Sequence, residues 1–508
     1  MRLQFYCSRF VLFLNLHTKI IMTKYKHILL LLLISASFFA CRDNIDFSNN
    51  PNINLSFSTD TVLFDTIFTT IGSTTRQFKF YNNNDEAVKT TIQLSNSNSS
   101  YYRLNIDGQP ANKVKDYEIL AHDSAFVFVE VNIDPQNSNS PMVIEDSVMF
   151  ITNGNTQNVK LVAYGQDVHL YNDSVIDTRT WINDKPYLIY NSILVDKNQT
   201  LTIEEGVRIY FHNESAMWVL GTLQVHGTVD NPVTFQGDRL EEWYKYTPGQ
   251  WYAYYINKEK DIKYLTGGIH FWKGSDNNII DHAIIKNGVK GIQVDSVGEG
   301  DNPTLTLSNS IVKNMSAIGL MAQSSKVLVF NSVIANCGYY AVVLSLGGHY
   351  EFYQSTIGNY YDFNTRKTPS LIFNNYYKNE DKYYTFDFSA IFGNSIIYGN
   401  IDSEFFIDQH PDETKPFSFL FDHCLMKLDD EFDTNNKDIY KSIIRDKDSL
   451  PRFINTYEGN FRLDTLSAAI NKGSVFYSTM IPTDQDDNDR NMDGKPDLGA
   501  YERIPEKK

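Results

Sequence analysis

A six-residue phrase recurs through the middle of this chain: HAIIKN at 282–287, NSIVKN at 309–314, NSVIAN at 331–336 and QSTIGN at 354–359. Two looser copies follow, NSIIYGN at 394–400 and HCLMK at 423–427. The closest copies begin 22 and 23 residues apart, and the others begin 27, 29 and 40 residues apart. A repeat of this size with insertions of unequal length predicts a solenoid, in which each copy belongs to one coil of the stack.

The aligned copies differ in chemistry from column to column. The first column holds an amide or imidazole and the second a small residue. The fourth is aliphatic throughout: Ile285, Val312, Ile334, Ile357, Ile397, Met426. We interpret the fourth column as core and the second as an inward corner. The first column is interpreted as structural rather than catalytic, because buried polar groups at turns need hydrogen-bond partners.

The residues between the phrases select the type of solenoid. Leu305 and Leu307 alternate with Thr304, Thr306 and Ser308, and this period of two is typical of a strand. The period has no room for the ten or more residues of helical spacing that a helical repeat needs. A coil of about 22 residues built from short strands and turns predicts a right-handed, single-stranded parallel β-helix.

The N-terminal region has the features of a secretory signal. From Met22 the chain reads MTKYKHILLLLLISASFFAC, in which Lys24 and Lys26 precede an apolar run that ends at Cys41. The apolar run is short for a transmembrane helix. The Ala–Cys junction resembles the bacterial lipobox, which implies that Cys41 carries lipid and becomes the new N-terminus.

The segment after the signal has all-β patterning. About seven short alternating runs, such as RQFKFY and AFVFVEV, are separated by Asn, Asp, Gly and Ser turns. This spacing predicts an immunoglobulin-like sandwich. The expected organisation is a removed signal and extension at 1–40, a lipidated tether at 41–53, the sandwich at 54–168, the β-helix at 187–463 with insertions at 238–266 and 360–384, and a capping segment at 464–508.

Two kinds of resemblance accompany these patterns. The opening coils, LTIEEGVRIYF, GTLQVHGT and NPVTF, are similar to bacterial parallel β-helix proteins of the pectate-lyase-like superfamily. The combination of FDTIFTTIGSTTRQFKFYN, GGIHFWKGSDNNIIDHAIIKNG and the terminal DLGAYE resembles predicted cell-envelope lipoproteins that join an Ig-like domain to a β-helix. The resemblance implies an architecture and an outer-membrane location, facing the periplasm or the cell exterior, but no reaction.

The first insertion is rich in aromatic residues. One interpretation is that these form a sugar-binding platform, since amphipathic rings on loops stack on pyranose faces. The alternative is that the insertion folds back to cover the barrel. The candidate ligand-binding residues are Trp243, Tyr244, Tyr246, Trp251, Tyr252, Tyr254 and Tyr255.

The C-terminal segment contains a candidate calcium loop, DQDDNDRNMDGKPDLGAYE. Asp489, Asn491, Asp493 and Asp497 match the alternating oxygen ligands of such a loop. Ala500 occupies the twelfth position, where a bidentate acid is expected. An Asx turn is the alternative to a calcium site.

The net charge and the distribution of acidic residues argue against some classes of function. The formal charge of −16 argues against nucleic acid as a partner. A polysaccharide lyase or hydrolase requires clustered acids or a cationic base, and the acids here fall singly in loops. We therefore expect a membrane-anchored protein that binds glycan or an envelope partner, with a carbohydrate-active enzyme or a purely adhesive surface protein as the alternatives.

Overall fold

The computed structural model describes residues 45–69, 71–96, 99–257, 262–266, 268–297, 301–411, 414–445 and 449–504. Cys41 and the predicted signal lie outside the described residues. Within these ranges, no helix has the length and apolar character needed to cross a membrane. The chain divides into two compact units, a sandwich and a β-helix.

The sandwich contains two sheets of five strands, ordered β1-β3-β8-β5-β6 and β2-β10-β9-β4-β7. The strands are β1 (Ser56–Phe57), β2 (Thr61–Phe68), β3 (Arg76–Tyr81), β4 (Val88–Leu94), β5 (Tyr102–Ile106), β6 (Gln109–Pro110), β7 (Lys113–Ile119), β8 (Ser124–Val131), β9 (Met142–Thr152) and β10 (Asn155–Gln166). Pairs such as β3–β8 and β4–β9 are antiparallel. Phe80 of β3 packs against Phe150 of β9, with ring centroids 5.1 Å apart, so aromatic side chains join the two sheets.

The β-helix is a coil of parallel strands that fall into three sheets, which we name A, B and C. Sheet A contains β13 (Tyr187–Val195), β16 (Met217–Val219), β21 (Ile269–Phe271), β24 (Lys290–Asp295), β27 (Ile318–Phe330), β29 (Tyr340–Tyr353), β31 (Leu371–Asn374) and β36 (Phe405–Asp408). The long strands β27 and β29 continue into sheet B, and the first half of β13 pairs in sheet C.

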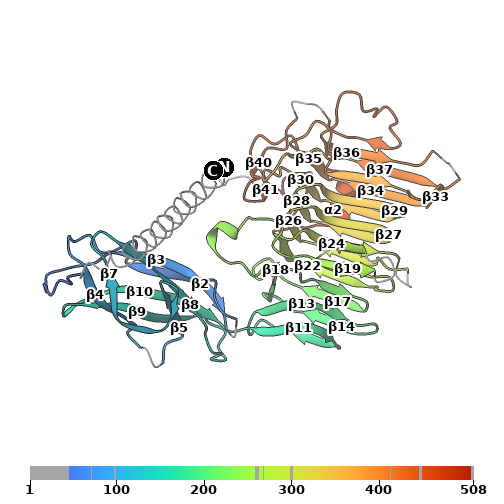
Figure 1. Cartoon of the computed structure of the whole chain (residues 1–508). Coiled ribbons are helices and arrows are strands. Elements are labelled where there is room, and N and C mark those ends of the chain that lie inside the picture. The colour runs from blue at the N-terminus through green and yellow to red at the C-terminus, as the bar shows by residue number, and fades with distance from the viewer. Residues whose placement is uncertain are drawn as a thin grey trace, which may run out of the picture. The chain divides into compact units, whose positions relative to one another are not determined.

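The other two sheets follow the same order of coils. Sheet B adds β12 (Arg179–Trp181), β14 (Thr200–Ile203), β17 (Thr222–His226), β22 (Asn278–Asp281), β25 (Leu305–Ser308), β34 (Phe388–Gly393), β37 (Phe417–Asp422) and β39 (Tyr440–Lys441). Sheet C adds β15 (Arg208–Phe211), β18 (Val233–Gly237), β23 (Ala283–Lys286), β26 (Ile311–Met315), β28 (Val333–Cys337), β30 (Thr356–Asn359), β35 (Ile396–Gly399) and β38 (Leu425–Met426). Figure 1 shows these strands stacked coil upon coil.

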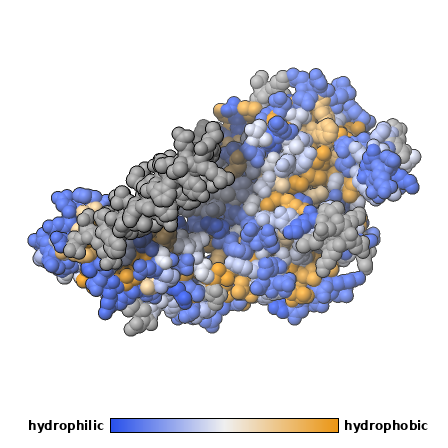
Figure 2. Space-filling view, in the orientation of Figure 1, coloured by the Kyte–Doolittle hydropathy of each residue, from blue (hydrophilic) through white to orange (hydrophobic). Residues whose placement is uncertain are grey.

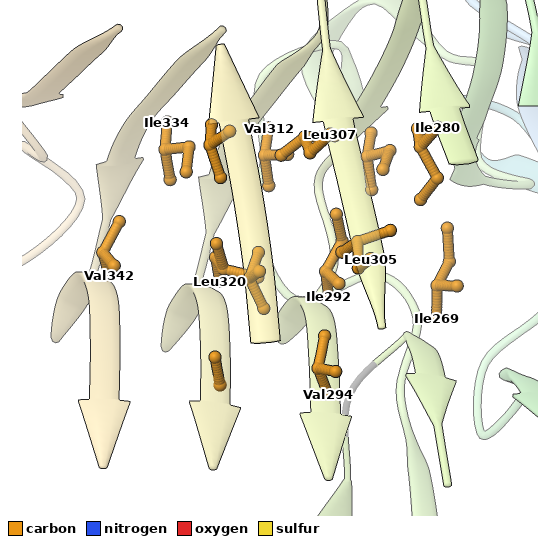
Figure 3. Packing of buried hydrophobic residues seen from close by; sticks show 14 of the residues in the cluster. Ile269, Ile280, Ile292, Val294, Leu305, Leu307, Val312, Leu320, Ile334 and Val342 are labelled. Atoms are coloured by element: carbon orange, nitrogen blue, oxygen red, sulfur yellow. The ribbon is translucent and has the colours of Figure 1, made fainter. Parts of the chain in front are cut away.

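Aliphatic side chains from all three sheets fill the interior of the coil. Because successive residues of a strand point to opposite faces, alternate residues line the core, and the in-register pairing stacks like on like. Ile292, Leu320 and Val342 form such a stack in sheet A, and Val312 and Ile334 form one in sheet C (Figure 3). The fourth column of the repeated phrase is buried in every coil, which confirms the predicted all-β class with a parallel β-helix.

The first column of the phrase forms a corner in the left-handed backbone region. Its residues have φ between 48° and 52°: His282, Asn309, Asn331, Gln354, Asn394 and His423. Asparagine tolerates this conformation better than branched residues do, and this explains its frequency there. Asn331 also donates from Nδ2 to Oδ1 of Asn309 at 3.0 Å, so amides of neighbouring coils bond along the stack.

The first and last coils of the β-helix lie at other residues than the expected limits, 187 and 463. Strand β11 (His169–Ile176) pairs in parallel with β13, so the first coil begins before residue 187, where the β-helix is expected to start. At the other end, β40 (Phe453–Asn455) and β41 (Asn460–Leu463) pair with each other in an antiparallel hairpin. Alternating apolar and polar residues predict a strand, but they do not show which strand it pairs with. The β-helix was expected to end at residue 463, and the last coil ends before that residue.

The C-terminal segment packs along the outer side of sheet C. It contains the short helix α2 (Val475–Met480). Phe461 and Tyr501 cluster with Val333 and Ala335, which point outward from β28. Gly358 is required here, because a Cβ on it would lie 2.3 Å from the Phe461 ring. The segment therefore covers one side of the coil.

Candidate functional site

An aromatic groove lies over the outer face of sheet A, across the first coils. Its volume is about 660 Å³. The hairpin of β19 (Ala253–Asn257) and β20 (Ile262–Thr266) forms one side of it. The lining residues are Asp173, Ser174, Val175, Asn191, Ser192, Ile193, Leu194, Glu214, Trp218, Leu220, Ala253, Tyr254, Tyr255, Lys263 and Trp272.

The floor of the groove contains two tryptophans that strand alternation turns outward. Met217 and Val219 are buried in the core, so Trp218 between them faces out. Trp272 follows the buried Phe271. The two indole rings are 5.8 Å apart, and the imidazole of His270 stacks on Trp272 at 4.8 Å. The floor is therefore a continuous aromatic surface supported by the sheet.

The wall of the groove is the first insertion, folded as the β19–β20 hairpin. Tyr255 contacts Trp272 edge to face, with centroids 5.3 Å apart. Lys263 on the opposite strand places Nζ over the ring of Tyr254, 5.6 Å from its centroid. The Tyr254 and Tyr255 side chains remain 40% and 42% exposed. The hairpin thus exposes both rings to solvent, and Tyr255 also contacts the floor of the groove.

Polar side chains lie directly beside the aromatic floor. Nε2 of His270 is 2.6 Å from Oδ2 of Asp295, and Nε2 of Gln293 donates to the same carboxylate at 3.2 Å. Lys290 donates from Nζ to Oε1 of Gln293 at 3.2 Å, and burial lowers the pKa of Lys290. Asp295 contacts His270 directly, and Gln293 holds the Asp295 carboxylate. His270 is thereby held where its ring stacks on Trp272.

The structure separates the seven predicted aromatic residues. Only Tyr254 and Tyr255 of the seven line the groove. The ring of Tyr252 lies 5.4 Å from that of Tyr254 but is not part of the lining. Burial and the neighbouring Glu214 raise the pKa of Tyr252. The remaining four residues belong to other environments.

Trp251 requires a correction, because its side chain is fully buried. The indole stacks on Phe211 at 4.3 Å and donates from Nε1 to the carbonyl of Lys286 at 2.9 Å. A ring enclosed in this way has no face left for a ligand. Sequence alone did not reveal this, because an insertion rich in aromatic residues does not indicate which of them returns to the core.

Trp243, Tyr244 and Tyr246 lie on a separate part of the insertion, outside the groove. The short helix η1 (Glu242–Tyr244) carries the first two. Arg239 lies over the Tyr244 ring at 4.2 Å, and Tyr246 packs against Tyr457 at 5.8 Å. Trp243 is 70% exposed. The insertion therefore both covers the coil, as the alternative interpretation proposed, and forms the wall of the groove.

Sequence reasoning missed Trp218 and Trp272, although a signal for both was present. Each tryptophan occupies an outward position in a strand or next to its end, where the alternating pattern calls for a polar residue. Leu220 and Leu194 occupy outward positions nearby and also line the groove. Several apolar residues grouped at outward positions of neighbouring coils indicate a surface that contacts something other than water.

The second insertion also forms a hairpin, made of β32 (Tyr376–Asn379) and β33 (Lys382–Thr385) (Figure 1). Tyr377 and Tyr384 stack on each other at 4.9 Å. Further hydrophobic residues are exposed on the visible face of the β-helix near β27 and β29 (Figure 2). No residue of β27, β29, β32 or β33 lines the groove.

The candidate calcium residues use their oxygens within the protein. Oδ1 of Asp489 accepts from the backbone N–H of Asn491 at 2.9 Å, which is an Asx turn. Asp497 is buried, and its two oxygens accept from the backbone N–H groups of Asn471 and Arg503. Burial raises the pKa of Asp497. Among the described residues, no group of three His, Cys, Asp or Glu side chains is arranged to hold a metal. Calcium binding stays a prediction.

A second cavity, of about 810 Å³, lies near the last coils. Acidic and basic side chains meet there: Asp402, Asp429, Asp430 and Glu431 with Lys427 and Arg445. Arg445 donates to the carbonyls of Asp429 and Phe432 at 2.7 Å, so it holds the closing loop in place. Asp429, Asp430 and Glu431 are consecutive in the sequence, and the fold brings Asp402 to the same cavity.

Comparison with known proteins supports the fold of the second unit. Residues 187–357 match the family model described as a right-handed beta helix region. A search of curated proteins returned no match. The predicted right-handed β-helix is therefore confirmed at this level.

Solved structures resemble the chain only weakly. A family 123 glycoside hydrolase from Clostridium perfringens is 9% identical with a TM-score of 0.19, and the alignment covers 25% of this chain and 30% of that one. The catalytic unit of a GH87 alpha-1,3-glucanase from Streptomyces thermodiastaticus is 10% identical with a TM-score of 0.23, covering 69% and 66%. A PapD-like domain of human CEP192 is 8% identical with a TM-score of 0.17, covering 25% and 96%. This chain therefore spans less than a third of the length of the first of these proteins.

Proposed function

We propose that this protein is a lipid-anchored protein of the bacterial cell envelope whose β-helix binds a glycan in the aromatic groove. The observation that carries the proposal is the convergence of Trp218, Trp272, Tyr254 and Tyr255 on one groove. Two of these rings come from the coil and two from an insertion, so the arrangement requires both parts of the chain. An exposed aromatic surface of this kind usually marks a recognition site.

The chemistry of the groove suits a sugar better than a fully apolar ligand. Pyranose faces stack on aromatic rings, while hydroxyl groups need donors and acceptors at the rim. Asp173, Asn191, Glu214 and Lys263 supply these around the rings. Binding sites of this composition combine apolar contact area with a small number of polar groups that fix orientation.

Removing one ring from the groove is expected to weaken glycan binding. Trp218→Ala and Tyr254→Ala should each cost about 1–3 kcal/mol of binding free energy, because each deletes a stacking surface. By the same reasoning Trp218→Phe should retain most of the affinity. The binding glycan is first identified by an array screen of the purified chain, and each variant is then measured by calorimetry.

Tyr339→Ala is the control for this measurement, since Tyr339 is 59% exposed and does not line the groove. Its affinity should equal that of the parent. The proposal is wrong if no glycan binds the parent protein, or if Tyr339→Ala lowers affinity as much as the groove variants. Thermal melting of every variant checks that losses of affinity do not reflect unfolding.

The envelope location is tested at Cys41, the residue at the end of the signal. Cys41→Ala should move the protein from the membrane fraction to the soluble fraction, because the thiol that would carry the lipid is removed. Mass spectrometry of the N-terminal peptide should find acyl groups on the parent. Unchanged membrane partition together with an unmodified N-terminal peptide would refute lipidation.

The glycan screen also separates the alternative functions. A carbohydrate-active enzyme would release shorter products from the bound glycan, and the same mixtures can be examined for them after long incubation. A purely adhesive surface protein would bind no small glycan at all. Binding without product release is the result that the proposed function requires.

A further inference from the structure

Four polar side chains form a continuous line on the outer face of sheet B. His349, Glu351 and Tyr353 point outward from β29, because the residues between them, Tyr350 and Phe352, are fully buried in the core. Ser389 on β34 is in register with His349. Strand pairing alone therefore places the serine beside the imidazole, on a part of the coil that does not line the aromatic groove.

The hydrogen bonds in this line assign the tautomer of His349. Its Nε2 lies 2.9 Å from Oε1 of Glu351, and its Nδ1 lies 2.6 Å from Oγ of Ser389. An ionised carboxylate only accepts hydrogen bonds, so Nε2 carries the proton. Nδ1 is then left with a free lone pair, and the hydroxyl of Ser389 donates to it.

Glu351 is itself held in position from the other side. Tyr353 donates from its hydroxyl to Oε2 of Glu351 at 2.9 Å. Burial and the adjacent Glu351 carboxylate raise the pKa of Tyr353, so its hydroxyl keeps its proton and remains a donor. Tyr353 thus holds the carboxylate of Glu351, and Glu351 orients the imidazole of His349. The imidazole in turn faces the hydroxyl of Ser389.

This arrangement is the signature of an activated nucleophile, in which a base oriented by a third group contacts the nucleophile. We infer that Ser389, His349 and Glu351 form a nucleophilic site that hydrolyses carboxylic esters presented at the surface of sheet B. The side chains of His349 and Glu351 are 46% and 33% exposed, and Ser389 is half-buried, so the site is open to solvent.

The reaction needs only the ester and water. Oγ of Ser389 attacks the carbonyl carbon while Nδ1 of His349 takes the hydroxyl proton. The carbon–oxygen bond to the leaving alcohol breaks, and the alkoxide takes that proton from Nδ1. Water then attacks the acyl-serine, Nδ1 accepts its proton, and the acid leaves as Oγ regains a hydrogen. Glu351 is a positioning residue that keeps Nε2 protonated and stabilises the imidazolium.

The experiment uses the purified chain with p-nitrophenyl acetate and a fluorophosphonate probe. We expect probe adduct on the peptide that contains Ser389, and ester hydrolysis that falls at least about tenfold in Ser389→Ala and in His349→Gln. The pH profile of hydrolysis by the parent protein is recorded as the reference for the variants. Glu351→Gln should reduce the rate and distort this pH profile, which a merely structural ion pair would not do.

The control is Ser418→Ala, because Ser418 is the exposed serine in register with Ser389 on the next strand, β37. Its probe labelling and its rate should equal those of the parent. The inference is overturned if Ser389 takes no probe, or if His349→Gln is labelled and hydrolyses the ester as fast as the parent. Melting curves of the variants confirm that the coil is intact in each comparison.

Discussion

Ile334→Asp is expected to unfold the β-helix at ordinary temperature. Ile334 is only 1% exposed and lies in the main core cluster, stacked between Val312 and Ile357 in sheet C. An ionised carboxylate placed there has no partner, and an uncompensated buried charge costs about 3–5 kcal/mol. The lost aliphatic contacts add to this, and the sum is comparable with the total stability of most domains, about 5–15 kcal/mol.

The matched control is Thr306→Asp, on strand β25 of sheet B. Thr306 lies between the buried Leu305 and Leu307 and therefore points outward. The new carboxylate remains in water, so its melting curve should be nearly that of the parent. Circular dichroism during heating measures both variants. Equal melting of Ile334→Asp and the parent would mean that the fourth column of the phrase is not core.

The repeated phrase predicts the fold because one physical constraint determines the residue type in each of its columns. Ile334 fills the core, Ser332 fits a tight inward corner, and Asn331 adopts a φ of 49° that opens the corner. The hydroxyl of Ser332 also donates to the carbonyl of Phe330 at 2.8 Å, which supplies a backbone acceptor with a partner. Constraints that recur in every coil produce a periodic pattern in the sequence. The class of fold and the position of the core were therefore predictable.

Features that occur once in the chain produce no such pattern. The hairpin of β40 and β41 has the alternation of a coil strand, and only its local antiparallel pairing distinguishes it. Likewise, the sequence shows that the first insertion is aromatic, but not that it turns back so that Trp251 enters the core while Tyr254 stays exposed. The ends of the coil and the exact membership of the site depend on such contacts between distant segments.

The residues at outward positions of the coils also indicate where the aromatic groove lies. A strand of a parallel β-helix has one face in the core and one on the outside of the coil, so large apolar residues that gather at outward positions point to a surface that is covered or binds a ligand. Trp218 is assigned an outward position from its neighbours Met217 and Val219 alone. The line from Tyr353 to Ser389 is different, because it spans two strands and its register is visible only in the structure.

Trp251→Ala is expected to cost about 3–5 kcal/mol of stability, as deletion of a fully buried aromatic side chain does. The ring is enclosed by Phe211 and by two glycines, since a Cβ on Gly268 or Gly288 would lie 2.2 or 3.0 Å from its atoms. Neither glycine has a side chain to fill the cavity that remains. The carbonyl of Lys286 also loses the indole donor.

Trp243→Ala separates this packing role from a role in binding, because Trp243 belongs to the same insertion but is 70% exposed. It buries little surface, so its removal should leave the melting temperature nearly unchanged, while Trp251→Ala lowers it by several degrees. Thermal melting of the two variants side by side measures the difference. If Trp251→Ala instead melts like the parent and only loses affinity for glycan, the ring is at the surface and the burial described for it is wrong. If both variants lower the melting temperature equally, the helix η1 that carries Trp243 packs on the coil through that ring.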